Sequence, residues 1–437
     1  MLSKLTNLRR ASFISTAQRA FSNNAYYLGL DKKYVSNNYV SQPIALERAE
    51  RCYVWDADGR KYLDFLAGIA CANQGHSHPK IVQAIVDQAG KIAQPSRVFS
   101  NVHMGEFSKQ ICELLGYDQF CPSNGGVEAC ESAVKLARRW GYEVKGVEDN
   151  KANVLMANNN FWGRSICAAG GCDDPLRYRA FGPYGDGFPL VPYNDVPAIE
   201  EYLKHDPNCV AVMLEPIQGE AGVVVPDKGY LKKVQELCKK YNVLFIVDEV
   251  QIGFGRSGKM MGYNWDLGDD GRPDIVSMGK AISGGYTPVS GICAMKEVMD
   301  LIKPGEHGST FGGNPLGMAI ARAAVGVLVE ENMTENSYKM GEIFRARLRE
   351  EKGHLVKDVR GRGLFTGVEF DLENSMINSI DFESLARDNG LLCRIARKHC
   401  VRFSPPLILT EEEVHQGADL AIQSLRDLEE LNEKRKS

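Results

Sequence analysis

The sequence of 437 residues lacks an apolar run long enough to cross a membrane: stretches such as 243–247 are far shorter than the roughly 20 residues that a bilayer helix requires. No membrane span is therefore expected. Outside the N-terminus it also lacks a block of basic residues, and with a formal net charge of −4 it has no electrostatic footprint for nucleic acid. Twelve cysteines between Cys52 and Cys400 include no CxxC pair, which favours buried free thiols over disulfides or zinc sites.

Acidic residues are missing from positions 1–30, and the first is Asp31. Basic residues share this stretch with several serines and with leucines at helical spacing (Lys4, Arg9, Arg10 and Arg19; Leu2, Leu5 and Leu8). This composition is typical of a mitochondrial transit peptide, here assigned to residues 1–25, and predicts a location in the mitochondrial matrix. Arg19, three residues before Ser22, resembles the matrix-protease cleavage pattern, so Ser22 is the expected mature start. A disordered basic tail is the alternative.

The composition, 44% hydrophobic and 25% charged, is ordinary for a globular protein, and the order of apolar runs along the chain indicates its fold class. Five apolar, β-rich runs (153–156, 210–214, 243–247, 275–278 and 290–294) alternate with helical patterns such as 230–240. Strands separated by helices predict an α/β fold with a mostly parallel sheet that is covered on both faces. A helix is also predicted over 127–140, directly after a pair of glycines.

The two ends of the chain are predicted to form a smaller part. Two β-rich segments around Asp58-Gly59 indicate a hairpin. A long helical pattern follows 314–317 and runs to about 331, and helix, short strands and helix come after it. We therefore expect a large domain over 91–325, a small α+β domain over 326–437, and an N-terminal segment, 26–90, that packs with the small domain.

Two reactive groups stand where buried strands should end. Lys280 follows the apolar run 275–278 and is flanked by glycines, and Asp248 ends the run that begins at 244. The two strand ends could face one crevice, and a lysine amine with a carboxylate for a pyridinium nitrogen is the minimal set for pyridoxal phosphate chemistry. Taken alone, a lysine near a strand end is usually a solvated surface group, and an aspartate after a strand is more often a turn residue.

A different kind of enzyme is suggested by the G-x-G-x-x-G string at 253–258, which directly follows a strand. It would make the protein a dinucleotide-binding NAD(P)-dependent oxidoreductase. Such a turn should open a helix, but 259–265 has no long apolar period of 3.6 residues and 269–273 breaks the chain soon afterwards. His76, His78 and His307 likewise show no spacing typical of metal ligands, and no metal site is predicted.

Six strings between about residues 39 and 406 resemble the class III pyridoxal phosphate aminotransferases of fold type I, in the order that the family has them. They are 73–79, 161–164, 215–223, 248–251, Lys280 with its flanking glycines, and 307–315. The resemblance implies a large domain with a mostly parallel seven-stranded sheet, plus a smaller α+β domain from the N- and C-terminal segments. It also implies pyridoxal 5′-phosphate as the cofactor.

The resemblance assigns the cofactor contacts. Gly126 and Val127, at the start of the predicted helix, would hold the phosphate, since free N–H groups there attract anions. The family has a serine or threonine where Gly125 stands, so one hydroxyl contact is missing. Phe161 would stack on the ring, Asp248 would pair with the ring nitrogen, and Gln251 would bond the phenolic oxygen. Lys280 would hold the cofactor aldehyde covalently and then act as the proton-transferring base.

A homodimer is also implied by the resemblance. In the family, the residues that match Ser309 and Thr310 reach the phosphate of the neighbouring subunit, so the active sites would lie at the subunit interface. A non-catalytic scaffold on the same fold is the remaining alternative of a different class. Loss of Lys280, Asp248 or Arg402 would favour the scaffold, and all three residues are present.

The substrate contacts resemble those of family members that transfer the δ-amine of ornithine to 2-oxoglutarate. Arg402 would bind an α-carboxylate, and Glu220 would cover Arg402 while ornithine reacts. Tyr39 and Arg164 would hold ornithine's own carboxylate. Ile69 stands where ornithine-specific members commonly have tyrosine, and isoleucine occurs there in relatives that use N-acetylornithine or 4-aminobutyrate. Those two substrates therefore remain alternatives.

Overall fold

The computed structural model describes residues 22–373 and 375–437, so most of the predicted leader lies outside the described residues. The predicted mature start, Ser22, is the N-cap of α1 (Asn23–Tyr34), and its Oγ accepts a hydrogen bond from the Ala25 N–H at 3.1 Å. Within the described residues, no helix is both long enough and apolar enough to cross a membrane.

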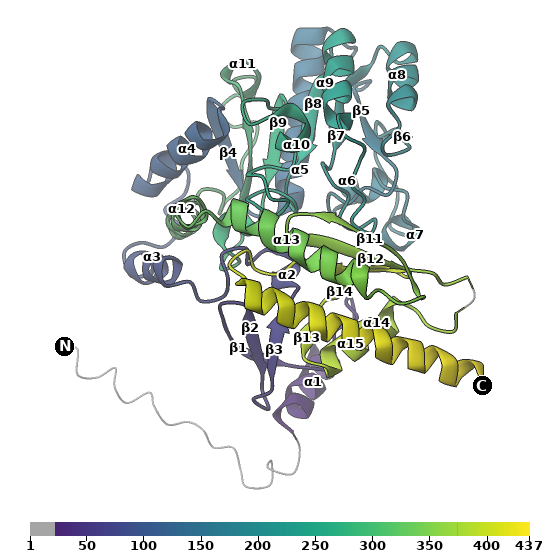
Figure 1. Ribbon diagram of the computed structural model, residues 1–437. Helices are drawn as coiled ribbons and strands as arrows, with labels where there is room; N and C mark the ends of the chain where they lie inside the picture. The colour runs from purple at the N-terminus through teal and green to yellow at the C-terminus, as the bar shows by residue number, and fades with distance from the viewer. Residues whose placement is uncertain (1–21, 374) are drawn as a thin grey trace, which may run out of the picture.

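A sheet of seven strands forms the centre of the larger part of the molecule (Figure 1). Across the sheet the order is β4 (Gln119–Ser123), β10 (Ser290–Ala294), β9 (Ile275–Met278), β8 (Leu244–Asp248), β7 (Cys209–Leu214), β5 (Asn153–Ala157) and β6 (Leu190–Val191). β10 pairs antiparallel with β4 and β9, and the other neighbours are parallel. The predicted α/β fold is confirmed, and each of the five apolar runs forms a strand.

Both faces of this sheet are buried. Val212 and Val247 enter one hydrophobic cluster, whereas their neighbours Met213 and Ile246 enter another. Helix α5 (Gly126–Trp140) packs against β9 and β10, and α9 (Tyr230–Lys240) packs against β8. Because helices cover both faces, the strands are continuously apolar rather than alternating, which is why the sequence pattern reveals them.

Further helices surround the sheet and support the turn that carries Lys280. Helix α12 (Pro315–Glu330) follows the prediction and packs against α3 (Pro79–Ala89), α4 (Val102–Leu115) and the short helix η3 (Lys280–Ser283). The shorter elements are α2 (Ala67–Ala70), η2 (Gly141–Lys145), α6 (Ile166–Gly170), α7 (Pro175–Tyr178), α8 (Val196–His205), α10 (Asn264–Leu267) and α11 (Lys296–Met299). The helix that follows β8 is α10, with four residues, so no helix opens at the glycine string 253–258.

The ends of the chain build two smaller sheets. One has the order β1 (Leu46–Glu50), β2 (Tyr53–Asp56), β3 (Lys61–Asp64) and β13 (Leu391–Leu392), so the N-terminal hairpin pairs with a C-terminal strand. The other is antiparallel, with the order β11 (Val356–Arg362), β12 (Phe365–Phe370), β15 (Cys400–Phe403) and β14 (Arg394–Arg397). Helices α13 (Met333–Glu350) and α14 (Ser379–Asp388) pack on α15 (Glu411–Lys436).

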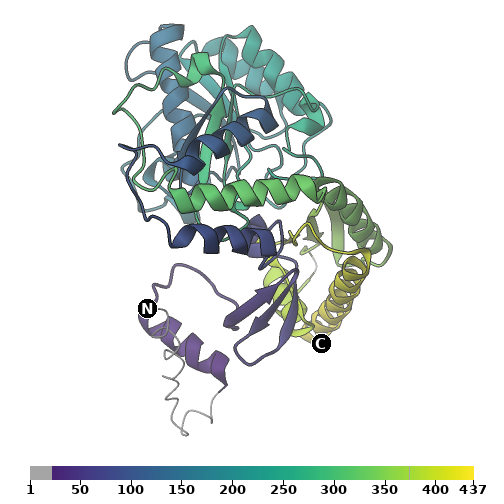
Figure 2. The same cartoon turned by 90° about the vertical axis from the view of Figure 1, so that its left-hand side faces the viewer.

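Figure 2 shows how the two ends of the chain meet. The purple N-terminal strands lie beside the yellow C-terminal elements, below the large sheet and its helices. Strand β15, which carries Arg402, therefore belongs to the smaller part, while Asp248 lies in the large sheet and Lys280 in η3, which follows strand β9 of that sheet. The domain boundaries at residues 25, 90 and 325 stay predictions.

Candidate active site

The carboxyl ends of the parallel strands bring three titratable groups together. Asp248 is the last residue of β8 and pairs in register with Ser277 of β9. Lys280 follows β9 after one residue, Gly279, and Glu215 comes directly after β7. Ligands of open α/β sheets bind at this edge, outside the carboxyl ends of the strands. The edge therefore positions an amine and two carboxyl groups at one place.

A cavity of about 240 Å³ lies at this edge and is called the inner cavity here. Its lining includes predicted cofactor residues from four different chain segments: Gly126, Val127, Phe161, Asp248, Gln251 and Lys280. Burial lowers the pKa of the Lys280 amine. Within residues 22–373 and 375–437, no hydrogen bond or ion pair to Lys280 Nζ is found. The amine is thus available to react in this cavity.

Asp248 is buried, with 5% of its surface exposed, and three neutral groups donate hydrogen bonds to it. The Val250 N–H (2.9 Å) and the Ser277 hydroxyl (3.3 Å) donate to Oδ1, and the Cys130 thiol donates to Oδ2 at 3.3 Å. Burial raises the pKa of Asp248, because these donors offset only part of the desolvation. A cationic ring nitrogen is the kind of partner that such a carboxylate lacks.

Sequence reasoning missed Glu215 and Cys130. Glu215 lines the inner cavity and accepts hydrogen bonds from the N–H groups of Phe161 (3.0 Å) and Gly219 (3.4 Å). Burial and the neighbouring charge of Asp248 raise its pKa to about 8. Its place after an apolar strand is the signal that could have revealed it. Cys130 gave no such signal, because on its helical face it has the pattern of an ordinary core residue.

The start of helix α5 forms one wall of the inner cavity. Gly125 is the N-cap, and no side chain caps this end, so the first N–H groups are left for an anion. A side chain at Gly126 would meet Val250 Cγ1 at 2.6 Å, so the backbone can approach only as glycine. Beside Gly125 the nearest atom to an added Cβ is 3.9 Å away. The hydroxyl that the family has there would therefore have room.

A second cavity, of about 700 Å³, is called the outer cavity here. It is lined by every residue predicted to contact substrate, namely Tyr39, Ile69, Arg164, Glu220 and Arg402. Phe161, Arg164 and Lys280 line both cavities. Lys280 therefore lies between the proposed cofactor space and the substrate space.

Glu220 covers Arg402 in the outer cavity. Glu220 Oε1 lies 2.6 Å from Arg402 Nη1, and the arginine is 1% exposed. Burial alone would raise the pKa of Glu220, but the Arg402 charge and hydrogen bond lower it to about 2. Gln251 joins the pair, since its Oε1 accepts from Arg402 at 3.0 Å and its Nε2 donates to Glu220 at 3.4 Å. Gln251 thus contacts this ion pair as well as lining the inner cavity.

Tyr39 and Arg164 meet at the other side of the outer cavity. Arg164 Nη1 donates to the Tyr39 hydroxyl at 2.9 Å. The guanidinium also lies 5.2 Å from the centre of the Phe161 ring. Unlike Arg402, this arginine forms no ion pair with a carboxylate among the described residues. It is the better placed of the two to receive a carboxylate while Glu220 remains on Arg402.

Ile69 lies in an unusual left-handed turn. Four successive residues have positive φ: Ala67 (49°), Gly68 (63°), Ile69 (62°) and Ala70 (62°). Such a turn is costly for residues with a Cβ, and it is typical of functional sites. Asp64 stabilises it, because its Oδ1 accepts from the N–H groups of Leu66 (2.8 Å) and Ala67 (2.9 Å). His76 Nε2 contacts the other Asp64 oxygen at 2.7 Å.

Ser309 and Thr310 are absent from the linings of both cavities. Ser309 Oγ accepts a hydrogen bond from the Asn124 side chain at 2.6 Å, and the Thr310 carbonyl accepts one from Gln94. The neighbouring Phe311 is 57% exposed. Within one chain, these two predicted phosphate ligands are therefore not brought to the cofactor space.

Comparison with known proteins adds to this geometry. Residues 34–425 match the family described as aminotransferase class-III. A probable mitochondrial ornithine aminotransferase of Caenorhabditis elegans is 47% identical over 426 residues, which is 98% of this chain and 98% of the relative. The structure of the ornithine aminotransferase from Toxoplasma gondii has a TM-score of 0.92 at 40% identity, with 97% of this chain and 99% of that chain covered. An acetylornithine aminotransferase from Elizabethkingia anophelis has a TM-score of 0.84 at 42% identity, with 93% and 100% covered.

Proposed function

The chain belongs to the class-III aminotransferase family, and we propose that it transfers the δ-amino group of L-ornithine to 2-oxoglutarate. The products would be glutamate and glutamate 5-semialdehyde, which cyclises to pyrroline-5-carboxylate. One observation carries the proposal: Glu220 neutralises Arg402 in the same cavity in which Arg164 remains without a carboxylate partner among the described residues. A site of this kind can receive a substrate whose α-carboxylate must lie away from Lys280.

Pyridoxal 5′-phosphate is the proposed cofactor, as the family implies. The inner cavity fits it in three respects. The amine of Lys280 has no partner in the described part of the chain, Asp248 is buried with only neutral donors, and the uncapped start of α5 faces the cavity. When bound, the cofactor supplies a cationic ring that accepts the electron pair released when a carbon beside the substrate nitrogen loses its proton.

The residues of the chain would divide the remaining work. Asp248 would keep the proton on the ring nitrogen, and the N–H groups of Gly126 and Val127 would bind the phosphate. Phe161 would lie against the ring and fix its plane. Lys280 would move the proton at the δ-carbon of ornithine, and the burial that lowers its pKa increases the share of neutral amine available as base.

Two substrates must use one outer cavity in turn. With Glu220 on Arg402, the α-carboxylate of ornithine would bind Arg164 and Tyr39, which directs the δ-amine toward Lys280. For 2-oxoglutarate, Glu220 would rotate away so that Arg402 can bind the α-carboxylate through two parallel hydrogen bonds. Ile69 leaves the wall near the substrate apolar, which is the observation that favours N-acetylornithine or 4-aminobutyrate as the second candidate.

We further propose a homodimer located in the mitochondrial matrix. Ser309 and Thr310 lie outside both cavities of their own chain, and apolar side chains near them are exposed, namely Val98 (82%), Phe99 (67%) and Phe311 (57%). A second copy would cover this surface and receive the two hydroxyl groups at its phosphate. The acid-free, arginine-containing N-terminus supports import, and fusion of residues 1–30 to a fluorescent reporter tests it; a cytosolic signal would exclude the leader.

A side-by-side assay tests the reaction. The purified protein should be yellow, and ornithine with 2-oxoglutarate should yield pyrroline-5-carboxylate and glutamate in equal amounts. N-acetylornithine and 4-aminobutyrate are the comparison donors. Faster turnover of N-acetylornithine than of ornithine would replace the proposal by the second candidate. No spectral change with any amine donor would instead favour a non-catalytic scaffold.

A further inference from the structure

Glu220 stands at the tip of a tight turn between Gln218 and Val224. These two residues pair through backbone hydrogen bonds of 3.1 and 2.9 Å, so residues 219–223 form a closed loop. At Gly219 an added side chain would overlap Gln251 Oε1, so only glycine allows this approach. The loop therefore holds the Glu220 carboxylate beside Arg402 from a backbone that has little room to shift.

The base of this loop has a strained backbone. Val223 has φ of 57°, which is a rare conformation for a β-branched residue, and Gly222 has φ of 110°. Val223 is fully buried against a small apolar cluster that contains Ile217 and Phe365. Strained residues persist only where their surroundings hold them in place. Apolar packing holds the Val223 side chain, and its carbonyl requires a separate partner.

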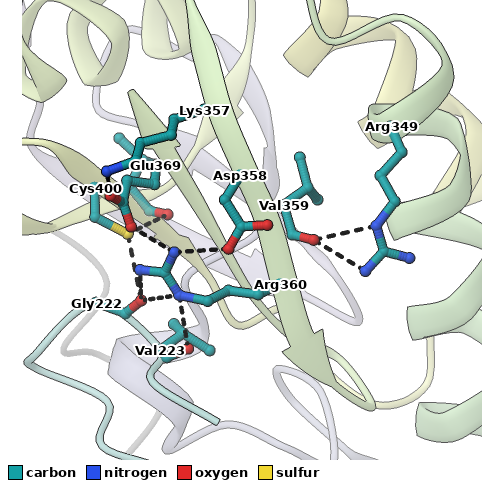
Figure 3. Close-up of polar contacts among 10 residues, drawn as sticks. Gly222, Val223, Arg349, Lys357, Asp358, Val359, Arg360, Glu369 and Cys400 are labelled. Carbon is teal, nitrogen blue, oxygen red and sulfur yellow. Dashed lines mark hydrogen bonds and ion pairs between the residues drawn. The ribbon is translucent and has the colours of Figure 1, made fainter. Parts of the chain in front are cut away.

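Arg360 of β11 is that partner (Figure 3). Its Nε donates to the carbonyls of Gly222 and Val223, both at 3.1 Å, and its Nη2 donates to Gly222 at 2.7 Å. The guanidinium is fixed from the other side by Asp358 (2.9 Å) and Glu369 (2.6 Å). All three contacts to the loop come from one side chain that lies 138 positions from Gly222 in the sequence.

The same small sheet carries Arg402. Strand β11 pairs with β12, and β12 pairs with β15, which contains both Cys400 and Arg402. The Cys400 thiol also contacts the Gly222 carbonyl at 3.5 Å. One sheet thus contacts the base of the Glu220 loop through Arg360 and Cys400. The same sheet carries Arg402, whose guanidinium contacts the Glu220 carboxylate at the tip of the loop. The distance between the two charged groups is set by this sheet and the loop together.

From this geometry we propose that Arg360 is a positioning residue that fixes the base of the loop, so that only the Glu220 side chain moves and it returns to Arg402 after each exchange of substrates. This inference rests on the proposed use of Arg402 by 2-oxoglutarate. Without Arg360, the Glu220 and Arg402 pair should open more readily. Arg402 would then be available to dicarboxylates, and ornithine would bind in the wrong orientation more often.

The test uses the cofactor-loaded full-length protein with three variants: Arg360→Gln, Arg360→Lys and, as a matched control, Arg349→Gln. Arg349 also donates to a backbone carbonyl of β11, that of Val359, at 3.1 and 2.9 Å, but it has no contact with the loop (Figure 3). Glutarate is the probe for Arg402, because it has the two carboxylates of 2-oxoglutarate and no group that can react.

Arg360→Gln should bind glutarate at least about fivefold more tightly and raise the KM for ornithine by a similar factor, since coupling between two binding events is typically 5- to 150-fold. The value of kcat should change less than KM. Amide hydrogen exchange of residues 218–224 should become faster. Arg360→Lys, which keeps the charge but not the two-pronged contact, should lie between the wild type and Arg360→Gln.

Unchanged glutarate affinity and unchanged exchange in Arg360→Gln, with Arg349→Gln equal to wild type, would overturn the positioning role. Equal weakening of glutarate and ornithine binding in Arg360→Gln and in the control Arg349→Gln would overturn it as well, because general damage to the small sheet would then be the cause. The proposed reaction fails by a different observation, namely a wild-type protein that binds glutarate but does not convert ornithine.

Discussion

Glu249, next to the proposed ring partner Asp248, allows a quantitative test of how burial at this edge of the sheet affects the protonation of a carboxyl group. Its side chain is fully buried (0% exposed) and is not among the residues that line the inner cavity. Oε1 accepts the Tyr263 N–H at 2.8 Å, while Oε2 has no hydrogen-bond partner among the described residues. Burial raises the pKa of Glu249 from 4.5 to about 8, so the folded protein keeps a proton that the unfolded chain has lost at neutral pH.

The sign and size of the effect follow from this shift. Because the folded pKa is the higher one, the contribution of Glu249 to stability is complete below about pH 4.5 and is lost as the pH rises toward 8. Within that window the free energy of unfolding should fall by about 1.4 kcal/mol per pH unit, and by about 5 kcal/mol over the whole window. Glu249→Gln cannot release a proton, so this part of the pH dependence should vanish.

Urea unfolding at pH 5.5 and pH 7.5 measures the effect. Between these two conditions the stability of Glu249→Gln relative to wild type should rise by about 3 kcal/mol. The comparison uses only the change in the stability difference between the two pH values, so the pH-independent cost of burying the new amide group cancels. Glu412→Gln, an exposed position in the first turn of α15, is the matched control and should follow the wild type. A pH-independent difference between wild type and Glu249→Gln would refute the assignment of a protonated buried acid.

Three further substitutions test the proposed site. Lys280→Ala should abolish turnover while light scattering still reports the wild-type assembly; substantial residual activity would contradict the base role. Cys130→Ala should weaken pyridoxal phosphate binding by about tenfold, because the thiol is the donor to Asp248 Oδ2, whereas Cys130→Ser keeps a donor and should bind nearly as wild type. Ile69→Tyr adds a hydroxyl to the outer cavity and should raise the preference for ornithine over N-acetylornithine by about fivefold, the size of one net hydrogen bond; an unchanged ratio of kcat/KM values would remove position 69 from substrate choice.

The strands that the sequence predicts are those buried on both faces. β5, β7, β8, β9 and β10 have continuous apolar sequences because helices cover both sides of the sheet. The two edge strands were missed for the corresponding reason. β4 (Gln119–Ser123) contains a proline and polar residues and pairs with β10 alone, and β6 has two residues. An edge strand has fewer neighbours that select for apolar residues, so its sequence carries a weaker pattern.

The residues of the proposed site likewise fall into two groups, those that the local sequence reveals and those that it does not. Asp248 and Lys280 could be found because each follows an apolar run, and position after a strand is a property of the local sequence. The roles of Cys130 and Arg360 depend instead on contacts across 118 and 138 positions, which leave no periodicity to detect. The left-handed turn at Ile69 is likewise invisible, since Ala67, Ile69 and Ala70 have no intrinsic preference for positive φ.

Two strained turns of this protein carry residues that line the outer cavity, Ile69 and Glu220, and a charged side chain supports each turn. Asp64 accepts hydrogen bonds from the left-handed turn of Ile69, and Arg360 donates hydrogen bonds to the carbonyls of Gly222 and Val223 at the base of the Glu220 loop. These two supporting side chains do not line the cavity themselves. Asp64 supports the turn of Ile69 and Arg360 supports the loop of Glu220, while Lys280, which itself has φ of 45°, lies in a separate turn after β9. Weakening either support should therefore change which substrate binds, and in which orientation, before it changes the rate of the proposed proton transfer. If the proposed roles hold, substitutions at residues that do not line the outer cavity should alter substrate selection while leaving the chemistry at Lys280 intact.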